Sequence, residues 1–272
     1  MTFIRKHATV TVWAVLLAAL AAGAFTGARM LSAKATPIAK VTYYTGDFRL
    51  QPPGKEDWKK AVINEGLVSG DKVRTMEQSR GEVAFADGSI IRIDASSNLD
   101  IVELKKDKGG QAAQAKVWSG KVWASVNKMS KKTKFELESP TAVAAVRGTV
   151  FRMTVSDDKT TKVAVYSGEV KVESSPDFMQ NQTKKQGGKA GEIEGPAQIK
   201  GPSEVSFEQW VQIVKTHMEI TINPDGTYGI VKFDPILDAQ DEWVKWNQMR
   251  DQLRKQKLGI QSQPAPADTT QK

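Results

Sequence analysis

Residues 139–155, Ser-Pro-Thr-Ala-Val-Ala-Ala-Val-Arg-Gly-Thr-Val-Phe-Arg-Met-Thr-Val, decide how this chain folds. The segment 141–146 has no charge and no turn residue, which predicts a strand that is buried on both faces. Arg147 and Gly148 interrupt this run, and a strand-like pattern resumes over 150–155. Because glycine inside a strand pattern marks a bulge or a close approach of two backbones, we expect the chain to turn at Gly148.

Arg147 has two interpretations. An unpaired buried guanidinium costs several kcal/mol, so an arginine in such a run must reach solvent or find an acceptor. It could contact a ligand, or it could be an internal pin that pairs with one of the acidic residues Asp71, Asp87 or Asp94. We favour the pin, because structural ion pairs are the commoner cause of a semi-buried arginine.

The run 141–151, T-A-V-A-A-V-R-G-T-V-F, resembles the signature of the FecR domain, where a segment of the type T-P-x-A-x-x-x-V-R-G-T-x-F is typical. Three other pieces occur in the order of the family: 70–75 (G-D-K-V-R-T), 85–89 (F-A-D-G-S) and 163–170 (V-A-V-Y-S-G-E-V). The resemblance covers about residues 40–175. Its signature positions, which we expect to be structural, are Gly70, Asp71, Asp87, Gly88, Arg147, Gly148, Thr149, Phe151 and Gly168.

The resemblance implies an all-β extracytoplasmic domain. The FecR protein itself is a membrane-spanning regulator that passes a signal from an outer-membrane transporter to a cytoplasmic sigma factor. That role needs a cytoplasmic domain ahead of the membrane segment. Only residues 1–7 precede the apolar stretch here, too few to fold, so we do not carry the sigma-factor role over.

The sequence indicates no catalytic, metal or cofactor site. The chain has no cysteine, which excludes disulfides, thiolate nucleophiles and thiolate metal ligands. Its two histidines are His7, in the segment assigned to targeting, and His217. No G-x-S-x-G, G-x-G-x-x-G or G-x-x-x-x-G-K-[ST] motif occurs. We therefore expect no enzyme, although a hydrolase with a carboxylate pair is retained as a third hypothesis.

The formal net charge of +8 does not indicate nucleic-acid binding. Recognition of nucleic acid would need a basic patch with aromatic platforms. The only dense basic run is 128–134, which falls between two predicted strands and is typical of a solvated loop.

The first 30 residues predict a signal peptide or membrane anchor. Residues 1–7 are basic, and 8–28 form an uncharged transmembrane helix candidate that is long enough to span a bilayer. The triplets ending at Ala24 and Ala28 resemble cleavage sites. We favour the uncleaved anchor, because the apolar run is longer than a usual signal-peptide core. The chain is then anchored in the inner membrane and faces the periplasm; after cleavage it would be soluble and periplasmic or extracellular.

The remaining chain is predicted to be mainly β. Turn signals recur about every eight to twelve residues over 38–175, which indicates an antiparallel β-sandwich or a rolled barrel. Residues 176–202 form a linker rich in Gly, Pro and Lys. A small α+β appendage follows over 203–260, with a helix at 203–218, a hairpin about 223–226 and a helix at 235–258. Residues 261–272 are expected to be disordered.

Four tryptophans are candidates for an interaction surface. Trp118 and Trp123 lie in a predicted hairpin over 116–126 and could line a peptide or glycan surface, although core positions are more usual for tryptophan in hairpins. Trp243 and Trp246 share one face of the second helix. They form an exposed patch unless the helices pack on the β domain, and we favour that packing.

Our first hypothesis is therefore a non-catalytic, exported FecR-like module that binds a protein or a cell-envelope glycan. The alternative is a single-span envelope sensor that passes a signal to another membrane protein.

Overall fold

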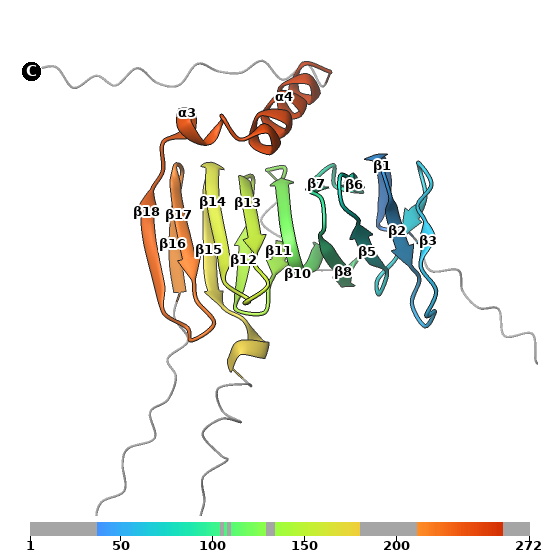
Figure 1. The fold of residues 1–272 in the computed structure, drawn as a ribbon, viewed down its shortest axis with the longest axis horizontal. Coiled ribbons are helices and arrows are strands. Elements are labelled where there is room, and N and C mark those ends of the chain that lie inside the picture. Colours follow the sequence, from blue (N-terminus) through green and yellow to red (C-terminus); the bar gives the residue numbers. More distant parts are fainter. Residues whose placement is uncertain (1–36, 104–105, 108–109, 129–133, 180–210, 258–272) are drawn as a thin grey trace, which may run out of the picture. The chain divides into compact units, whose positions relative to one another are not determined.

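The computed structural model describes residues 37–103, 106–107, 110–128, 134–179 and 211–257 (Figure 1). The described residues belong to one compact unit. The predicted leader, most of the linker and the tail lie outside the described residues. Among the described residues, no helix has the length and hydropathy that a bilayer span requires.

The first part of the chain forms β1 (Ala39–Thr45), β2 (Phe48–Gln51), β3 (Lys59–Lys60), β4 (Gly66–Leu67), β5 (Lys72–Thr75), β6 (Arg80–Phe85), β7 (Ile90–Ile93), β8 (Asn98–Glu103) and β9 (Lys106–Asp107). The second part forms β10 (Gly110–Ser125), β11 (Lys134–Glu138), β12 (Ala142–Val146), β13 (Val150–Val155), β14 (Thr161–Ser167), β15 (Glu169–Ser174), β16 (Val211–Lys215), β17 (Met218–Ile222), β18 (Tyr228–Lys232), α3 (Pro235–Asp238) and α4 (Glu242–Lys257).

The strands pair in two ladders that share β10. The first ladder has the order β4-β1-β6-β7-β10-β13-β14-β17-β18. The second has the order β3-β2-β5-β8-β10-β11-β12-β15-β16. All pairs are antiparallel except β10 with β11. The mainly β class is confirmed. The sheet is mixed rather than wholly antiparallel, however, and the rolled-barrel alternative is wrong because the sheet does not close.

The facing sides of the two ladders share one hydrophobic core. In β13, Phe151, Met153 and Val155 point into this core, and Arg152 between them points to the opposite side of the strand. Ala142 and Ala144 of β12 enter the core from the second ladder. This alternation leaves each ladder with an outer side, where the charged residues lie.

The helices cover the outer side of the first ladder. Trp123 of β10 packs with Trp243 and Val244 of α4 in a second buried cluster, which Tyr166 and Trp246 complete. Figure 1 shows α3 and α4 on the same side of the strands. The described residues thus form three layers, and the outer side of the second ladder is the uncovered one.

The predicted hairpin over 116–126 is wrong, because β10 is one continuous strand of 16 residues. Gly120, with a φ of +96°, bends the strand instead of reversing it. A Cβ there would lie 2.5 Å from the Cβ of Ser97, so the bend also needs the absence of a side chain. The bend sends one half of β10 to each ladder.

The prediction of a helix at 203–218 is also wrong over 211–218, the part of it that the structure describes. Residues Val211–Lys215 form β16, which pairs with β15 at the end of the second ladder. The hairpin about 223–226 is present as β17 and β18, and it extends the first ladder through β14. The second predicted helix is split into α3 and α4, which begin at the caps Asp234 and Asp241.

Candidate functional site

Three of the four predicted signature segments, 85–89, 141–151 and 163–170, meet residues 126–128 in one cluster of turns. The Asn127 side chain donates to the carbonyl of Asp87 at 3.0 Å, and the amide of Val126 donates to the carbonyl of Thr149 at 2.9 Å. The Thr149 hydroxyl donates to the carbonyl of Glu169 at 3.0 Å. These bonds hold segments from distant parts of the chain together.

Gly148 is required at the centre of this turn cluster. Its φ is +71°, and a Cβ would lie 2.3 Å from Cγ of Lys128 and 3.2 Å from its Cα. Gly168 also has a positive φ of +87°, and its missing Cβ leaves room for the carbonyl of Gly148. The prediction that Gly148 marks a close approach of two backbones is confirmed.

Arg147 follows β12 on the uncovered outer side and is exposed. The expectation that it is semi-buried is wrong, because the turn at Gly148 carries its side chain out of the core. The three acidic residues proposed as its partners have neighbours of their own. Asp94 accepts from Arg80 at 3.2 Å, Asp87 accepts from Ser89, and Asp71 accepts from the amide of Val68 at 2.6 Å.

A groove of about 630 Å³ opens beside Arg147 on the second ladder. Its described lining combines acidic, basic and apolar side chains: Lys128, Phe135, Glu136, Ala145, Val146, Arg147, Glu169, Lys171, Glu173 and Ile213. Neighbouring strands place Glu136 opposite Ala145, Ala145 opposite Lys171, and Lys171 opposite Ile213. One row across four strands therefore offers an acid, a base and an exposed apolar side chain.

An ion pair between two residues of β15 lies in the groove. The Nζ of Lys171 lies 2.7 Å from Oε2 of Glu173, and both side chains remain partly exposed. Exposed pairs of this kind contribute little to stability, about 0 to 1 kcal/mol, so their groups can exchange partners at low cost. The groove suits recognition of another charged surface better than it suits chemistry.

Trp118 flanks the groove face on β10, where its side chain is 39% exposed. Its Nε1 donates to Asp100 at 2.9 Å, and the ammonium of Lys116 lies 4.5 Å from the ring centroid. Lys116 also donates to Glu138 and Asp177. Burial lowers the pKa of Lys116, but its bonds to these two carboxylates outweigh that effect and the pKa is raised. The ring of Trp118 thus has one face already occupied by a cation.

Residues 71–171 match the family model described as FecR protein. The chain carries a FecR domain. The turn cluster and the groove beside Arg147 fall within or next to this match, and β16 lies beyond it.

Two crystal structures of a proposed anti-sigma factor from Parabacteroides distasonis ATCC 8503 are similar to this chain. The 1.65 Å structure shares 14% identity with a TM-score of 0.42, and the match covers 60% of each chain. The 2.50 Å structure shares 12% identity with a TM-score of 0.43, and the match covers 63% of this chain and 64% of that one. The matched part therefore spans less than two thirds of that protein. No curated protein matches the chain.

The remaining signature positions of the FecR domain lie elsewhere. The amide of Gly70 donates to the carbonyl of Ile101 at 2.7 Å, and the amide of Ile101 donates to the carbonyl of Asp71 at 2.8 Å. Burial raises the pKa of the Asp71 carboxyl, and the bond from Val68 opposes this only in part. Phe151 is a core residue. These residues fix the ends of strands and are not brought to the groove.

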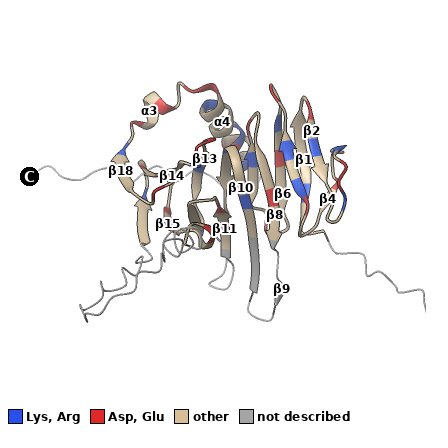
Figure 2. Ribbon diagram, turned by 60° about the horizontal axis from the view of Figure 1, so that its bottom comes forward, with Lys and Arg blue, Asp and Glu red and all other residues tan. Residues whose placement is uncertain are grey.

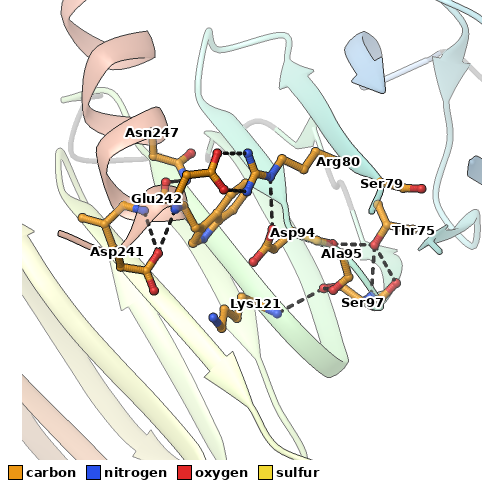
Figure 3. A network of polar contacts seen from close by, with 12 residues as sticks. Thr75, Ser79, Arg80, Asp94, Ala95, Ser97, Lys121, Asp241, Glu242 and Asn247 are labelled. Carbon is orange, nitrogen blue, oxygen red and sulfur yellow. Dashed lines mark hydrogen bonds and ion pairs between the residues drawn. The ribbon is translucent and has the colours of Figure 1, made fainter. Parts of the chain in front are cut away.

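Three of the four predicted surface tryptophans are covered, because α4 packs on the first ladder as we favoured. Trp123 and Trp243 are buried, and Trp246 stacks on Trp243 with ring centroids 5.3 Å apart. The guanidinium of Arg80 lies over both rings of this stack. Figure 3 shows Arg80 between Asp94 of the sheet and Glu242 of α4. These tryptophans therefore attach the helix and do not form a patch.

Sequence reasoning missed the buried ion network under α4. The Arg92 side chain is only 1% exposed; its Nε donates to Glu82 at 2.7 Å and its Nη1 donates to Asp251 at 2.7 Å. Arg250 also reaches Glu82 at 3.1 Å, and the Nε1 of Trp123 donates to Asp251. The sequence contains a signal for this network, because Arg92 interrupts the apolar run 90–93 in the same way that Arg147 interrupts the apolar run 141–151. Among the described residues, no group of side chains has the make-up of a metal site.

Proposed function

We propose that this FecR-domain chain is a non-catalytic regulatory module that binds a protein partner in the groove beside Arg147. The single observation that carries the proposal is the row of Glu136, Ala145, Lys171 and Ile213 on the outer side of the second ladder, which offers an acid, a base and an exposed apolar side chain. Among the described residues, the helices occupy the opposite outer side and no helix covers the groove side, which supports a partner site there.

The chemistry of the groove favours a protein over a glycan. Sugar recognition would use exposed aromatic faces, and Trp118 already has Lys116 against its ring and Asp100 on its Nε1. A protein segment of alternating charge with one apolar residue would complement Glu136, Lys171 and Ile213 in register. Binding would then depend on electrostatic complementarity, with a strong effect of salt on the association rate.

The module is proposed to act outside the cytoplasm, since the basic start and apolar stretch of 1–28 have the pattern of an export signal. If the stretch stays uncleaved, the chain is a single-span sensor whose groove meets another envelope protein. Release of the chain from membranes by carbonate, or a mature N-terminus after Ala24 or Ala28, would exclude that version.

The test uses a photo-crosslinking amino acid at Ile213, which is 49% exposed at the groove. In cells, we expect illumination to give a crosslinked product, and we expect a protease to digest that product. The double change Arg147→Glu and Lys171→Glu should lower its yield by about tenfold, which corresponds to about 1.4 kcal/mol. The matched control is Lys162→Glu, an exposed lysine on the first ladder, which should leave the yield unchanged.

Each other outcome contradicts the proposal in its own way. If muramidase digests the crosslinked product and protease does not, the partner is a glycan and not a protein. Equal loss of product with the groove variant and with Lys162→Glu would show that the charges act nonspecifically. Turnover of a substrate by the purified full chain would exclude a purely binding role.

A further inference from the structure

We propose that a second copy of this chain docks on the helical layer, with the two α4 helices antiparallel about a two-fold axis. The surface is distinct from the groove beside Arg147, and the inference does not depend on the function proposed for that groove.

The solvent side of the helical layer is apolar at four positions. Ile236 and Leu237 of α3 are 78% and 62% exposed, and Met249 and Leu253 of α4 are each 51% exposed. Met249 and Leu253 are one helical turn apart, so they share one stripe on α4. Single exposed apolar residues are ordinary, but several on two consecutive helices mark an interaction surface.

The α3 turn presents its two side chains in a fixed position. Asp234 caps it by accepting from the amides of Ile236 and Leu237, and Pro235 begins the first turn. At its other end, Asp238 accepts from the Tyr166 hydroxyl at 2.6 Å and from Arg152 at 3.1 Å. Because the backbone is held at both ends, little entropy is lost when these side chains enter a partner's surface.

The charges along the layer are arranged for an antiparallel partner. The exposed Asp234 caps α3 and the exposed Asp241 caps α4, whereas the exposed Lys255 and Lys257 lie in the last turn of α4. Figure 2 shows acidic residues on α3 and basic residues on α4. A parallel copy would place like charges together, whereas an antiparallel copy places each acidic start beside the partner's basic end. The helix dipoles favour the same orientation.

The basic end of α4 also offers a place for the α3 side chains. A groove of about 350 Å³ lies there. Its apolar lining is Ile90 and Leu253, and its charged lining is four basic residues and one acid: Arg92, Arg250, Arg254, Lys257 and Glu82. Only residues 239–241 separate α3 from α4, so on an antiparallel partner Ile236 and Leu237 reach this basic end. The contact is made twice, as a two-fold interface requires.

The acids beside Ile236 favour a second copy over a lipid surface. Asp234 and Asp241 flank the α3 side chains, and an anionic membrane would repel them. A partner with a basic groove would attract them, and this chain has such a groove.

Disulfide trapping tests the arrangement, because the chain has no cysteine of its own. In the full chain, Met249→Cys lies near the middle of α4 and should form a disulfide-linked dimer under mild oxidation. The control Lys162→Cys, on an exposed part of β14, should stay monomeric. If Met249→Cys gives no more dimer than Lys162→Cys, the proposal is overturned.

Charged replacements at Ile236, made in the Met249→Cys background, test the docking of α3. Ile236→Lys faces the partner's basic groove and should lower the yield of dimer by about tenfold. Ile236→Glu loses the same apolar contact but meets opposite charge, so it should lower the yield by less. Equal yields for lysine and glutamate would overturn the antiparallel arrangement and would point to a purely apolar contact such as lipid. Circular dichroism of each variant checks that the fold is retained.

Discussion

Arg92 and Asp251 are separated by 159 residues in the chain, yet Nη1 of one lies 2.7 Å from Oδ1 of the other beneath α4. Glu82 accepts from the Nε of the same guanidinium, so one arginine joins β6, β7 and the helix. The other carboxyl oxygen of Asp251 accepts from Trp123. The C-terminal helix is thus attached to the FecR domain through a buried network of charges in addition to apolar packing.

Replacement of Arg92 by methionine should destabilise the protein by about 3 to 5 kcal/mol. The change leaves Glu82 and Asp251 buried without their shared cation, and breaking a buried pair on one side costs that much. Urea unfolding followed by circular dichroism measures the loss.

Arg49→Met is the matched control for this change. Arg49 pairs with Asp47 at 2.7 Å, but both side chains are partly exposed. An exposed pair contributes about 0 to 1 kcal/mol, so the control should change the free energy of unfolding by no more than that. Equal effects of the two variants would contradict the importance of the buried network.

Glu82 should make stability depend on pH in the acidic range. Burial raises its pKa, but the hydrogen bond and charge of Arg92 outweigh the burial and the pKa is lowered overall. A carboxyl with a lowered folded pKa stabilises the protein above its unfolded pKa, about 4.3 for glutamate. That contribution is lost as the pH falls through the lower, folded pKa.

The free energy of unfolding of Glu82→Gln measures this effect. The difference between the wild-type protein and the variant should be largest near neutral pH and should shrink as the pH falls below about 4. A difference that stays constant from pH 7 to pH 3 would show that the charge of Glu82 contributes nothing.

Part of this fold could be predicted from the sequence, because the strands are local patterns. The alternation over 150–155 predicts which side chains of β13 enter the core, and the break at Gly148 predicts a turn. The position of β10 could not be predicted in this way. Ser119-Gly120 has turn chemistry, and only the contact between Gly120 and Ser97 shows that the chain bends there and continues.

The site was harder to predict than the strands. Arg147 and Arg92 have the same local pattern, one arginine in an apolar run, and they have opposite environments. Which of them is buried depends on α4, a helix that lies more than ninety residues after both in sequence. For the same reason, the pattern around Trp123 could not show that this residue is covered.

Gly148→Ala should cost more stability than the same change at another glycine with positive φ. Both Gly148 and Gly54 have a φ near +70°, so each variant carries about 1 to 2 kcal/mol of backbone strain. At Gly54 a Cβ meets nothing within 4 Å, whereas at Gly148 it meets Lys128. We expect an additional cost of about 1 to 3 kcal/mol at Gly148, the range for overpacking, measured by urea unfolding. Equal costs would mean that the turn cluster adapts without strain.

Tyr166 should not ionise when the folded protein is titrated to about pH 11. Burial raises the pKa of its hydroxyl well above the usual value, and its bond to Asp238 adds to this, against the opposing charge of Arg152. The raised pKa means that the stabilising contribution of the neutral phenol is present below its unfolded pKa of about 10 and is lost as the pH rises further. The measurement is the absorbance change of tyrosine on titration, compared between wild type and Tyr166→Phe.

In the folded state, wild type and Tyr166→Phe should show the same change in tyrosine absorbance up to pH 11, because Tyr166 does not ionise in that range. In urea the variant should give a smaller amplitude, because it lacks one of the four tyrosines. A smaller amplitude for the folded variant as well would contradict the prediction. It would show that Tyr166 ionises in the folded protein, and that Asp238 does not hold α3 against β14 in the way its 2.6 Å bond indicates.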